Sequence, residues 1–334
     1  MSRKLSLGMA INEAIRIAME TDPDVILMGE DVAGGGDRAG DDVDEMGGVL
    51  GTTRGLVKAF PDRVLDTPIS EMGILGTAVG AAVTGLRPVV ELMFIDFLGT
   101  CLDPLLNQAA KLRYMFGGKA RVPLTVRTVT GAGMQAAAQH SQSLYWITAG
   151  IPGLKTVIPS NPADAKGLLL AAIRDDNPVV FCEPKLVLGA SGEVPEGDYE
   201  VPIGKAQLVR EGSDVSLIGF GGTLPVCLQA AEQLAADGIE SDVLDLRSLQ
   251  PLDEDAILAT LARTGRVVIV DEATPRSSVA GDVAALCVDR GFDFLESPVK
   301  RVMAPHSPVP FSRVLEQAYL PSAARVVEAV RSQA

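Results

Sequence analysis

The stretch Thr67-Pro68-Ile69-Ser70-Glu71-Met72-Gly73 begins a nearly uncharged segment, in which Glu71 is the only charged residue between Asp66 and Arg87. Small residues follow at helical spacing and would share one helix face: Gly73, Gly76, Thr77, Gly80, Ala81 and Thr84. Glycine disfavours a helix, so packing must hold this one together. The stretch predicts a carboxylate at the mouth of a close-packed helix, with a face open to a backbone or a flat ligand. The simpler alternative is that Glu71 only stabilises the helix, because a negative charge in the first turn is favoured by the helix dipole.

Short apolar runs alternate with helical patterns along the whole chain. The predicted strands are 25–28, 89–94, 124–129, 156–158, 179–182, 215–218, 241–244 and 266–270. The predicted helices are 9–20, 98–115, 225–237, 254–263 and 279–289. Continuous apolar strands are typical of parallel sheets buried on both faces. The pattern predicts an α/β fold with mostly parallel sheets.

The chain has 334 residues, which favours two domains. Residues 186–203 are rich in Gly and Pro and are predicted to be a linker between domains 1–185 and 204–334. The acidic residues between Asp37 and Glu45 lack the spacing of a calcium loop and are predicted to form a solvated loop.

Composition excludes several classes of partner. The formal net charge is −14 without a basic stripe, so nucleic acid is not expected as a partner. No apolar run is long enough to span a bilayer, so no membrane association is expected. The N-terminus does not have the pattern of a signal peptide. Four scattered cysteines without a C-x-x-C pair favour a reducing cytoplasm over a zinc site.

A glycine-rich turn raises the alternative of an NAD-dependent oxidoreductase. Gly219 to Thr223 lies between a predicted strand and helix, and Asp245 ends the next strand, which is the context of a dinucleotide loop. Leu224, however, occupies the position where close helix–strand packing requires Gly or Ala. An ordinary tight turn is therefore the favoured interpretation.

Three chemically distinct side chains map near the carboxyl ends of neighbouring strands. Glu71 is a carboxylate, Phe97 an aromatic face and His140 one of only two imidazoles in the chain. Ligands of open α/β sheets gather at this edge, so the three residues predict a cofactor site. The sequence lacks the Gly-Asp-Gly motif, followed by Asn about thirty residues later, with which thiamine-diphosphate enzymes hold Mg²⁺ and diphosphate.

The sequence resembles the β subunits of two-subunit 2-oxo-acid dehydrogenase E1 components. The motifs that match, in order, are Gly29-Glu30-Asp31, Thr67 to Gly73, Phe94-Ile95-Asp96-Phe97, Gln139-His140-Ser141 and Asp176-Asn177-Pro178-Val179. The resemblance implies a transketolase-like fold of two doubly wound domains, a pyrimidine-binding domain and a C-terminal domain. It also implies an α2β2 heterotetramer that binds thiamine diphosphate between an E1 α subunit and this chain, with Mg²⁺ held mainly by the α subunit.

The resemblance also assigns roles to residues. Glu71 would hydrogen-bond the aminopyrimidine nitrogen of the cofactor and drive its tautomerisation. Phe97 would stack on that ring, Ile69 would line its pocket, and Glu30 would support the site. His140 would face the reacting carbon as a proton donor or as a guide for the lipoyl group. A separate loop with Asp175 and Asn177 matches a structural potassium site of some relatives.

Within this family, two segments lean toward acetoin dehydrogenase. They are the glycine-rich loops at 34–36 and 47–51, and residues 303–311 near the C-terminus. Acetoin would be cleaved to acetaldehyde, and the acetyl unit would pass to a lipoyl-bearing E2 acyltransferase. Pyruvate or another 2-oxo acid is the alternative substrate. A non-catalytic interaction subunit on the same fold is a further alternative, although such a subunit needs no acid at position 71.

Overall fold

The computed structural model describes residues 2–34 and 47–333, and the predicted acidic loop lies outside these residues. The strands are β1 Ser2–Ser6, β2 Val25–Gly29, β3 Val64–Asp66, β4 Arg87–Phe94, β5 Thr125–Thr130, β6 Lys155–Val157, β7 Val179–Pro184, β8 Ser191–Pro195, β9 Gln207–Arg210, β10 Val215–Gly219, β11 Ser241–Asp245, β12 Ser248–Gln250, β13 Val267–Asp271 and β14 Lys300–Met303. The α-helices are α1 Leu7–Thr21, α3 Leu56–Ala59, α4 Glu71–Val83, α5 Ala110–Met115, α6 Tyr145–Ala149, α7 Pro162–Arg174, α8 Leu224–Ala236, α9 Glu254–Thr264, α10 Val279–Gly291, α11 Arg313–Tyr319 and α12 Ala323–Arg331. Short 3-10 turns are η1 Ile95–Thr100, η3 Ala138–His140, η4 Lys185–Val187, η5 Gly221–Thr223 and η6 Phe292–Phe294, and η2 Pro104–Ala109 is a π-helix. Within the described residues, no helix has the length and apolarity needed to cross a membrane.

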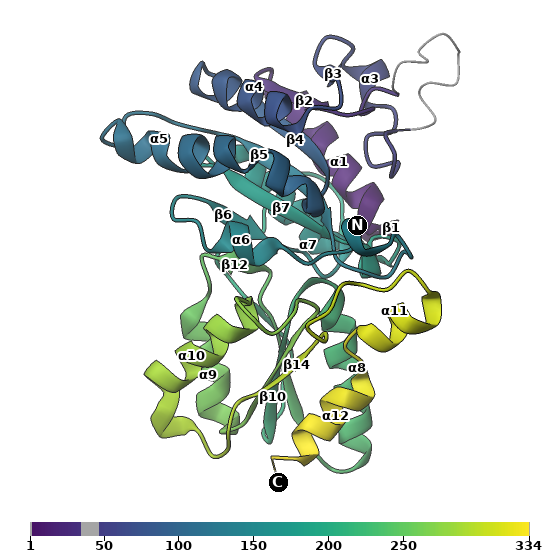
Figure 1. Cartoon of the computed structure of the whole chain (residues 1–334), viewed down its shortest axis with the longest axis vertical. Helices are drawn as coiled ribbons and strands as arrows, with labels where there is room; N and C mark the ends of the chain where they lie inside the picture. Colours follow the sequence, from purple (N-terminus) through teal and green to yellow (C-terminus); the bar gives the residue numbers. More distant parts are fainter. Residues whose placement is uncertain (1, 35–46, 334) are drawn as a thin grey trace.

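Two sheets form the centres of two α/β layers, one above the other in Figure 1. The first has seven strands in the order β12-β6-β7-β5-β4-β2-β3, and its pairs are parallel except β12 with β6. The second has five strands in the order β14-β13-β10-β11-β9, with β9 antiparallel. The mostly parallel α/β architecture predicted from the sequence is confirmed.

The central strands are buried on both faces, which is why they read as continuous apolar runs. Helices α1 and α7 pack on one face of the first sheet, and α4 packs on the other. In the second sheet, α9 and α10 cover one face, and α8 and α12 cover the other (Figure 1). One apolar cluster continues from Leu92 in the first sheet to Ile218 in the second. The two layers therefore share a core.

Two predicted segments differ from the observed structure. The expected helix 98–115 is divided into η1, η2 and α5. Pro104 has no N–H to donate, which a helix tolerates only in its first turn, so the helical stretch starts near residue 102 and not at 98. The predicted linker 186–203 contains β8, which pairs antiparallel with β1 at the N-terminus. The domain boundaries themselves stay a prediction.

Helix α4 buries one face and exposes the other. Its apolar side chains Ile74, Leu75, Ala78, Val79 and Ala82 are buried in the core. The small-residue face at Gly73, Gly76, Thr77 and Gly80 is exposed. A Cβ added at Gly76 or Gly80 would meet no neighbouring atom within 4 Å among the residues that the structure describes. Packing within this chain therefore holds the apolar face of α4 and does not account for its glycines.

Candidate active site at the carboxyl edge of the first sheet

Adjacent strands β2, β4 and β5 place the predicted site residues along one edge of the first sheet. Glu30 follows β2, Phe97 lies in η1 after β4, and His140 lies in the loop after β5. Glu71 is the first residue of α4, and the preceding Ser70 makes no side-chain capping bond. The fold therefore collects a carboxylate pair, an aromatic ring and an imidazole from four separate segments.

Three rings form the centre of this edge. The centroid of His140 lies 5.1 Å from that of Phe94 and 5.5 Å from that of Phe97, and the two Phe rings are 5.9 Å apart. All three pairs meet edge to face, a favoured aromatic geometry. Asp96, between the two Phe residues, accepts hydrogen bonds from the backbone and side-chain amides of Gln142 at 3.1 and 2.9 Å. That contact ties the His140 loop to η1.

Glu71 is connected to this cluster through η1. The single Thr100 O–H has two acceptors within reach, the Phe97 carbonyl at 2.7 Å and the Glu71 carboxylate at 3.2 Å. Burial raises the pKa of the Glu30 carboxyl, and the negative charges of Asp31, Glu71 and Glu91 raise it further. Ile69 is 75% exposed, so it is available to a bound group. The half-buried Glu71 carboxylate thus lies near a second carboxyl with a raised pKa, an aromatic ring and an exposed aliphatic side chain.

Beneath the edge lies a buried ion network. Arg127 of β5 donates from Nε to Glu183 at 2.8 Å, from Nη1 to Glu91 at 3.2 Å and from Nη2 to Thr52 at 2.9 Å. Burial raises the pKa of both Glu91 and Glu183, while Arg127 opposes that rise. Sequence reasoning missed this network, although single charges inside otherwise uncharged strands could have signalled it. Because Glu91 acts on Glu30, the network belongs to the electrostatic surroundings of the site.

The loop with Asp175 and Asn177 lies away from these residues, where the chain enters β7. The Asp175 carboxylate pairs with Lys155 and accepts two hydrogen bonds from Asn177, both at 2.9 Å. Burial opposes the ionised form, but these bonds outweigh it and lower the pKa of Asp175. Among the described residues no group of three or more His, Cys, Asp or Glu side chains could hold a metal ion. The potassium site therefore stays a prediction.

The glycine turn of the NAD alternative is filled by protein. A Cβ on Gly221 would lie 2.8 Å from Ile158, and one on Gly222 would lie 2.9 Å from Leu186. Asp245 is buried and accepts from Ser160 at 2.9 Å. These glycines serve close packing between the two layers, so the turn has no room for a pyrophosphate.

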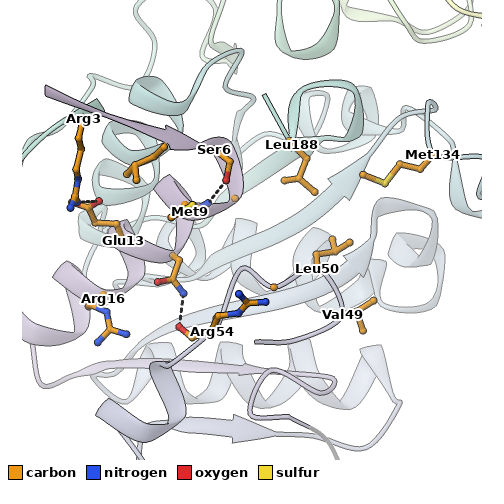
Figure 2. A pocket seen from close by; sticks show the side chains of 15 residues that line it. Arg3, Ser6, Met9, Glu13, Arg16, Val49, Leu50, Arg54, Met134 and Leu188 are labelled. Carbon is orange, nitrogen blue, oxygen red and sulfur yellow. Dashed lines mark hydrogen bonds and ion pairs between the residues drawn. The ribbon is translucent and has the colours of Figure 1, made fainter. Parts of the chain in front are cut away.

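Figure 2 shows a cavity of about 840 Å³ between the start of α1 and the segment 49–54. Arg54 lies at its centre, and Arg3 pairs with Glu13 at one end. Its lining includes Met134 but neither Glu71 nor His140. This cavity is therefore separate from the edge that carries Glu71, Phe97 and His140.

Comparison with protein families matches both halves of the chain. Residues 3–190 match the transketolase pyrimidine binding domain, and residues 204–326 match the transketolase C-terminal domain. A solved structure described as a split gene transketolase, inactive beta4 tetramer, superposes with a TM-score of 0.80 over 98% of both chains. Its sequence is 21% identical, so this likeness concerns the fold.

Curated relatives give a more specific assignment. The acetoin:2,6-dichlorophenolindophenol oxidoreductase subunit beta of Bacillus subtilis (strain 168) is 59% identical over 98% of this chain and 96% of its own length. The protein of the same name from Cupriavidus necator is 53% identical over 99% and 98%. The pyruvate dehydrogenase E1 component subunit beta of Bacillus subtilis is 42% identical over 98% of both chains. The chain therefore belongs to the transketolase-like family of oxidoreductase β subunits that contains these acetoin and pyruvate dehydrogenase proteins.

Proposed function

We propose that this chain is the β subunit of a thiamine-diphosphate-dependent E1 enzyme that cleaves acetoin to acetaldehyde. The observation that carries the proposal is the 59% identity to a relative named for acetoin, against 42% to the pyruvate dehydrogenase subunit of the same organism. The acetyl unit would pass to the lipoyl group of an E2 acyltransferase. Pyruvate or another 2-oxo acid is the second candidate substrate.

The residues at the carboxyl edge fit the pyrimidine end of thiamine diphosphate. Glu71 offers a carboxylate to a ring nitrogen, Phe97 an aromatic surface and Ile69 an exposed apolar side chain. When bound, thiamine diphosphate supplies a nucleophilic carbon and an electron sink for the cleaved bond. The sequence has no Gly-Asp-Gly motif with its later Asn, so Mg²⁺ and the diphosphate would be held mainly by the α subunit.

The roles of the protein groups follow from their chemistry. Glu71 would hold and return the proton at the pyrimidine nitrogen, and Glu30, whose pKa is raised by burial and by neighbouring charges, would support the site. Phe97 would pack against the ring and exclude water. His140 would exchange a proton at the reacting oxygen or orient the lipoyl group. A non-catalytic subunit would not need this constellation.

We propose an α2β2 heterotetramer in which the exposed face of α4 contacts the α subunit. A Cβ on Gly76 or Gly80 of this face would meet no neighbouring atom of the described residues within 4 Å, and both acetoin relatives are named as β subunits. The matches to 3–190 and 204–326 support domains at 1–185 and 204–334 with a linker at 186–203. Four buried free thiols agree with a cytoplasmic location. A structural K⁺ at Asp175 and Asn177 is the least supported part of the proposal.

The test compares substrates with the reconstituted enzyme. The purified chain is mixed with its α subunit, thiamine diphosphate and Mg²⁺, and reduction of 2,6-dichlorophenolindophenol is followed with acetoin or pyruvate. We expect faster reduction with acetoin, with acetaldehyde released in equal amount. A clear preference for pyruvate moves the assignment to the second candidate.

A second arm tests the partner. An isolated lipoyl domain is added in place of the dye, and its mass is measured after acetoin turnover. We expect an added acetyl group that depends on acetoin. Turnover with the dye but no acetylated lipoyl domain would remove the E2 acyltransferase from the proposal and leave the cleavage reaction in place.

A further inference from the structure

A buried lysine lies directly behind the imidazole of the site. Lys185 is the first residue of η4, immediately after β7, and is only 4% exposed. Its ammonium donates to the backbone carbonyl of His140 and lies 4.7 Å from the centroid of Phe94. Phe94 in turn lies against the His140 ring. Lys185 therefore contacts both the backbone of His140 and one of the two rings that flank its imidazole.

Burial of the Lys185 ammonium in the protein interior is unfavourable in free energy. Burial lowers the pKa of Lys185, and the charges of Asp96, Glu272 and Glu316 oppose that change without forming an ion pair to it in the described residues. A buried ammonium with three donors is disfavoured unless specific contacts hold it. A hydrocarbon side chain would fill the same space more cheaply. What an ammonium provides here, and a hydrocarbon side chain would not, is the hydrogen bond to the His140 carbonyl and the contact with the Phe94 ring.

The chain on either side of His140 is held by carboxylates: Glu316 accepts from the backbone N–H groups of Gly133 and Gln135, and Asp96 accepts from Gln142. The His140 turn between these anchors is held at its own carbonyl by Lys185. It is a single 3-10 turn that follows two residues with positive φ, Gln135 at 53° and Ala137 at 62°. The His140 N–H reaches the Ala137 carbonyl at 3.4 Å, which is a long bond. Fixing the His140 carbonyl fixes the plane from which its side chain leaves the backbone.

We propose that Lys185 is a positioning residue that sets the orientation of the His140 imidazole between Phe94 and Phe97. Its catalytic consequence rests on the proposed function, in which His140 exchanges a proton or orients the lipoyl group. Displacement of a reacting group by about 1 Å can cost about a hundredfold in rate. Lys185 would thus act on turnover without touching the substrate.

The chain has only two histidines, which makes the orientation directly measurable. The full chain is labelled with ¹⁵N at the His imidazoles, and NMR is recorded without cofactor. Ring currents from Phe94 and Phe97 should displace the His140 signals, while exposed His306 serves as an internal reference. In Lys185→Met the His140 signals should move toward those of His306 or broaden, with His306 unchanged.

The matched control is Lys111→Met. Lys111 lies in α5, and its ammonium also donates to a backbone carbonyl, that of Pro152. The control substitution should leave both histidines unchanged. If Lys185→Met does not fold, Lys185→Gln is used, because its shorter amide cannot reproduce the cation and should displace the His140 signals in the same way. His140 signals identical to wild type in a folded Lys185 variant would overturn the proposal.

The kinetic arm uses the reconstituted enzyme. Lys185→Met should lower kcat for acetoin by about ten- to a hundredfold, while KM changes by less than about threefold, because the substrate contacts remain. A change confined to KM would contradict a positioning role. If wild type shows no acetoin turnover, the proposed function fails, whereas the NMR comparison still decides the role of Lys185.

Discussion

At the scale of single residues, substitution of Glu71 can distinguish a helix-dipole role of its carboxylate from a catalytic role. Glu254 is the matched control, because it is also the first residue of a helix, α9. We predict that Glu71→Gln and Glu254→Gln each change the free energy of unfolding by only about 0.3–1 kcal/mol. Only Glu71→Gln should lose turnover, by at least about a hundredfold, because an amide cannot hold and return the proton. Thermal melts and dye-reduction rates check both parts.

The outcome that would return Glu71 to a helix-dipole role is near wild-type turnover of a well-folded Glu71→Gln tetramer. A loss of activity accompanied by a lowered melting temperature would instead report misfolding. Equal loss in Glu254→Gln would point to a general effect of charge at helix starts.

Glu272 gives a prediction about pH. It is 4% exposed, and one carboxylate oxygen has no hydrogen-bond partner. Burial, with the charge of Asp271, raises its pKa to about 8, against about 4.3 in an unfolded chain. Between these values the folded state binds a proton that the unfolded state releases, so this group lowers stability as pH rises, by up to about 1.4 kcal/mol per pH unit. Above pH 8 its contribution is constant.

Glu272→Gln removes this titration. We predict that its melting temperature falls less than that of wild type between pH 5 and pH 8, so that the variant gains on wild type as pH rises. Glu232→Gln, on the exposed side of α8, is the control and should follow wild type. Parallel curves for wild type and Glu272→Gln would mean that Glu272 is ionised in the folded chain.

Residue patterns predicted part of the site. Glu71, Phe97 and His140 were expected to lie together because they map near the carboxyl ends of neighbouring strands, and parallel strands end at one edge. The contacts of Thr100 and Lys185 could not be predicted, since they join segments that only the fold brings together. A lysine after an apolar strand reads as a surface residue until the covering loop is known.

At the scale of elements, continuous apolar runs predicted the buried strands well, whereas strands without such a run were missed. The buried strands β5 and β7 appear within a residue or two of prediction at their starts. Strand β8 was missed because only Val194 of its residues is buried, so it shows no apolar run. It forms because β1, at the N-terminus of the chain, pairs with it.

Helix α4 gives an element-scale prediction. Gly76 has open space around it, so Gly76→Leu should raise the stability of the isolated chain by about 0.5–1 kcal/mol through helix propensity. If this face contacts the α subunit, the same change should weaken assembly. Ala324→Leu, at an exposed position of α12, is the control and should leave assembly unchanged. Melting of the chain alone and sedimentation of the α–β mixture measure the two effects.

If Gly76→Leu tetramers form with wild-type affinity, the proposed contact between α4 and the α subunit is contradicted. The glycines of α4 would then need another explanation than a partner's approach. Destabilisation of the isolated chain would be equally informative, because it would mean that the face is packed within this chain.

At the scale of the whole molecule, the proposed function divides the active site between this chain and an α subunit. The two layers share one apolar core, so this chain should fold and melt cooperatively without a partner. The residues that we propose to face the pyrimidine lie on this chain, whereas the diphosphate motif is absent from its sequence. We therefore predict that the isolated chain, given thiamine diphosphate, Mg²⁺, acetoin and dye, shows no turnover. Titration with the α subunit should restore activity and reach a plateau at one α per chain. Full turnover of the chain alone would contradict the division of the site between two subunits, and a plateau at another ratio would contradict α2β2.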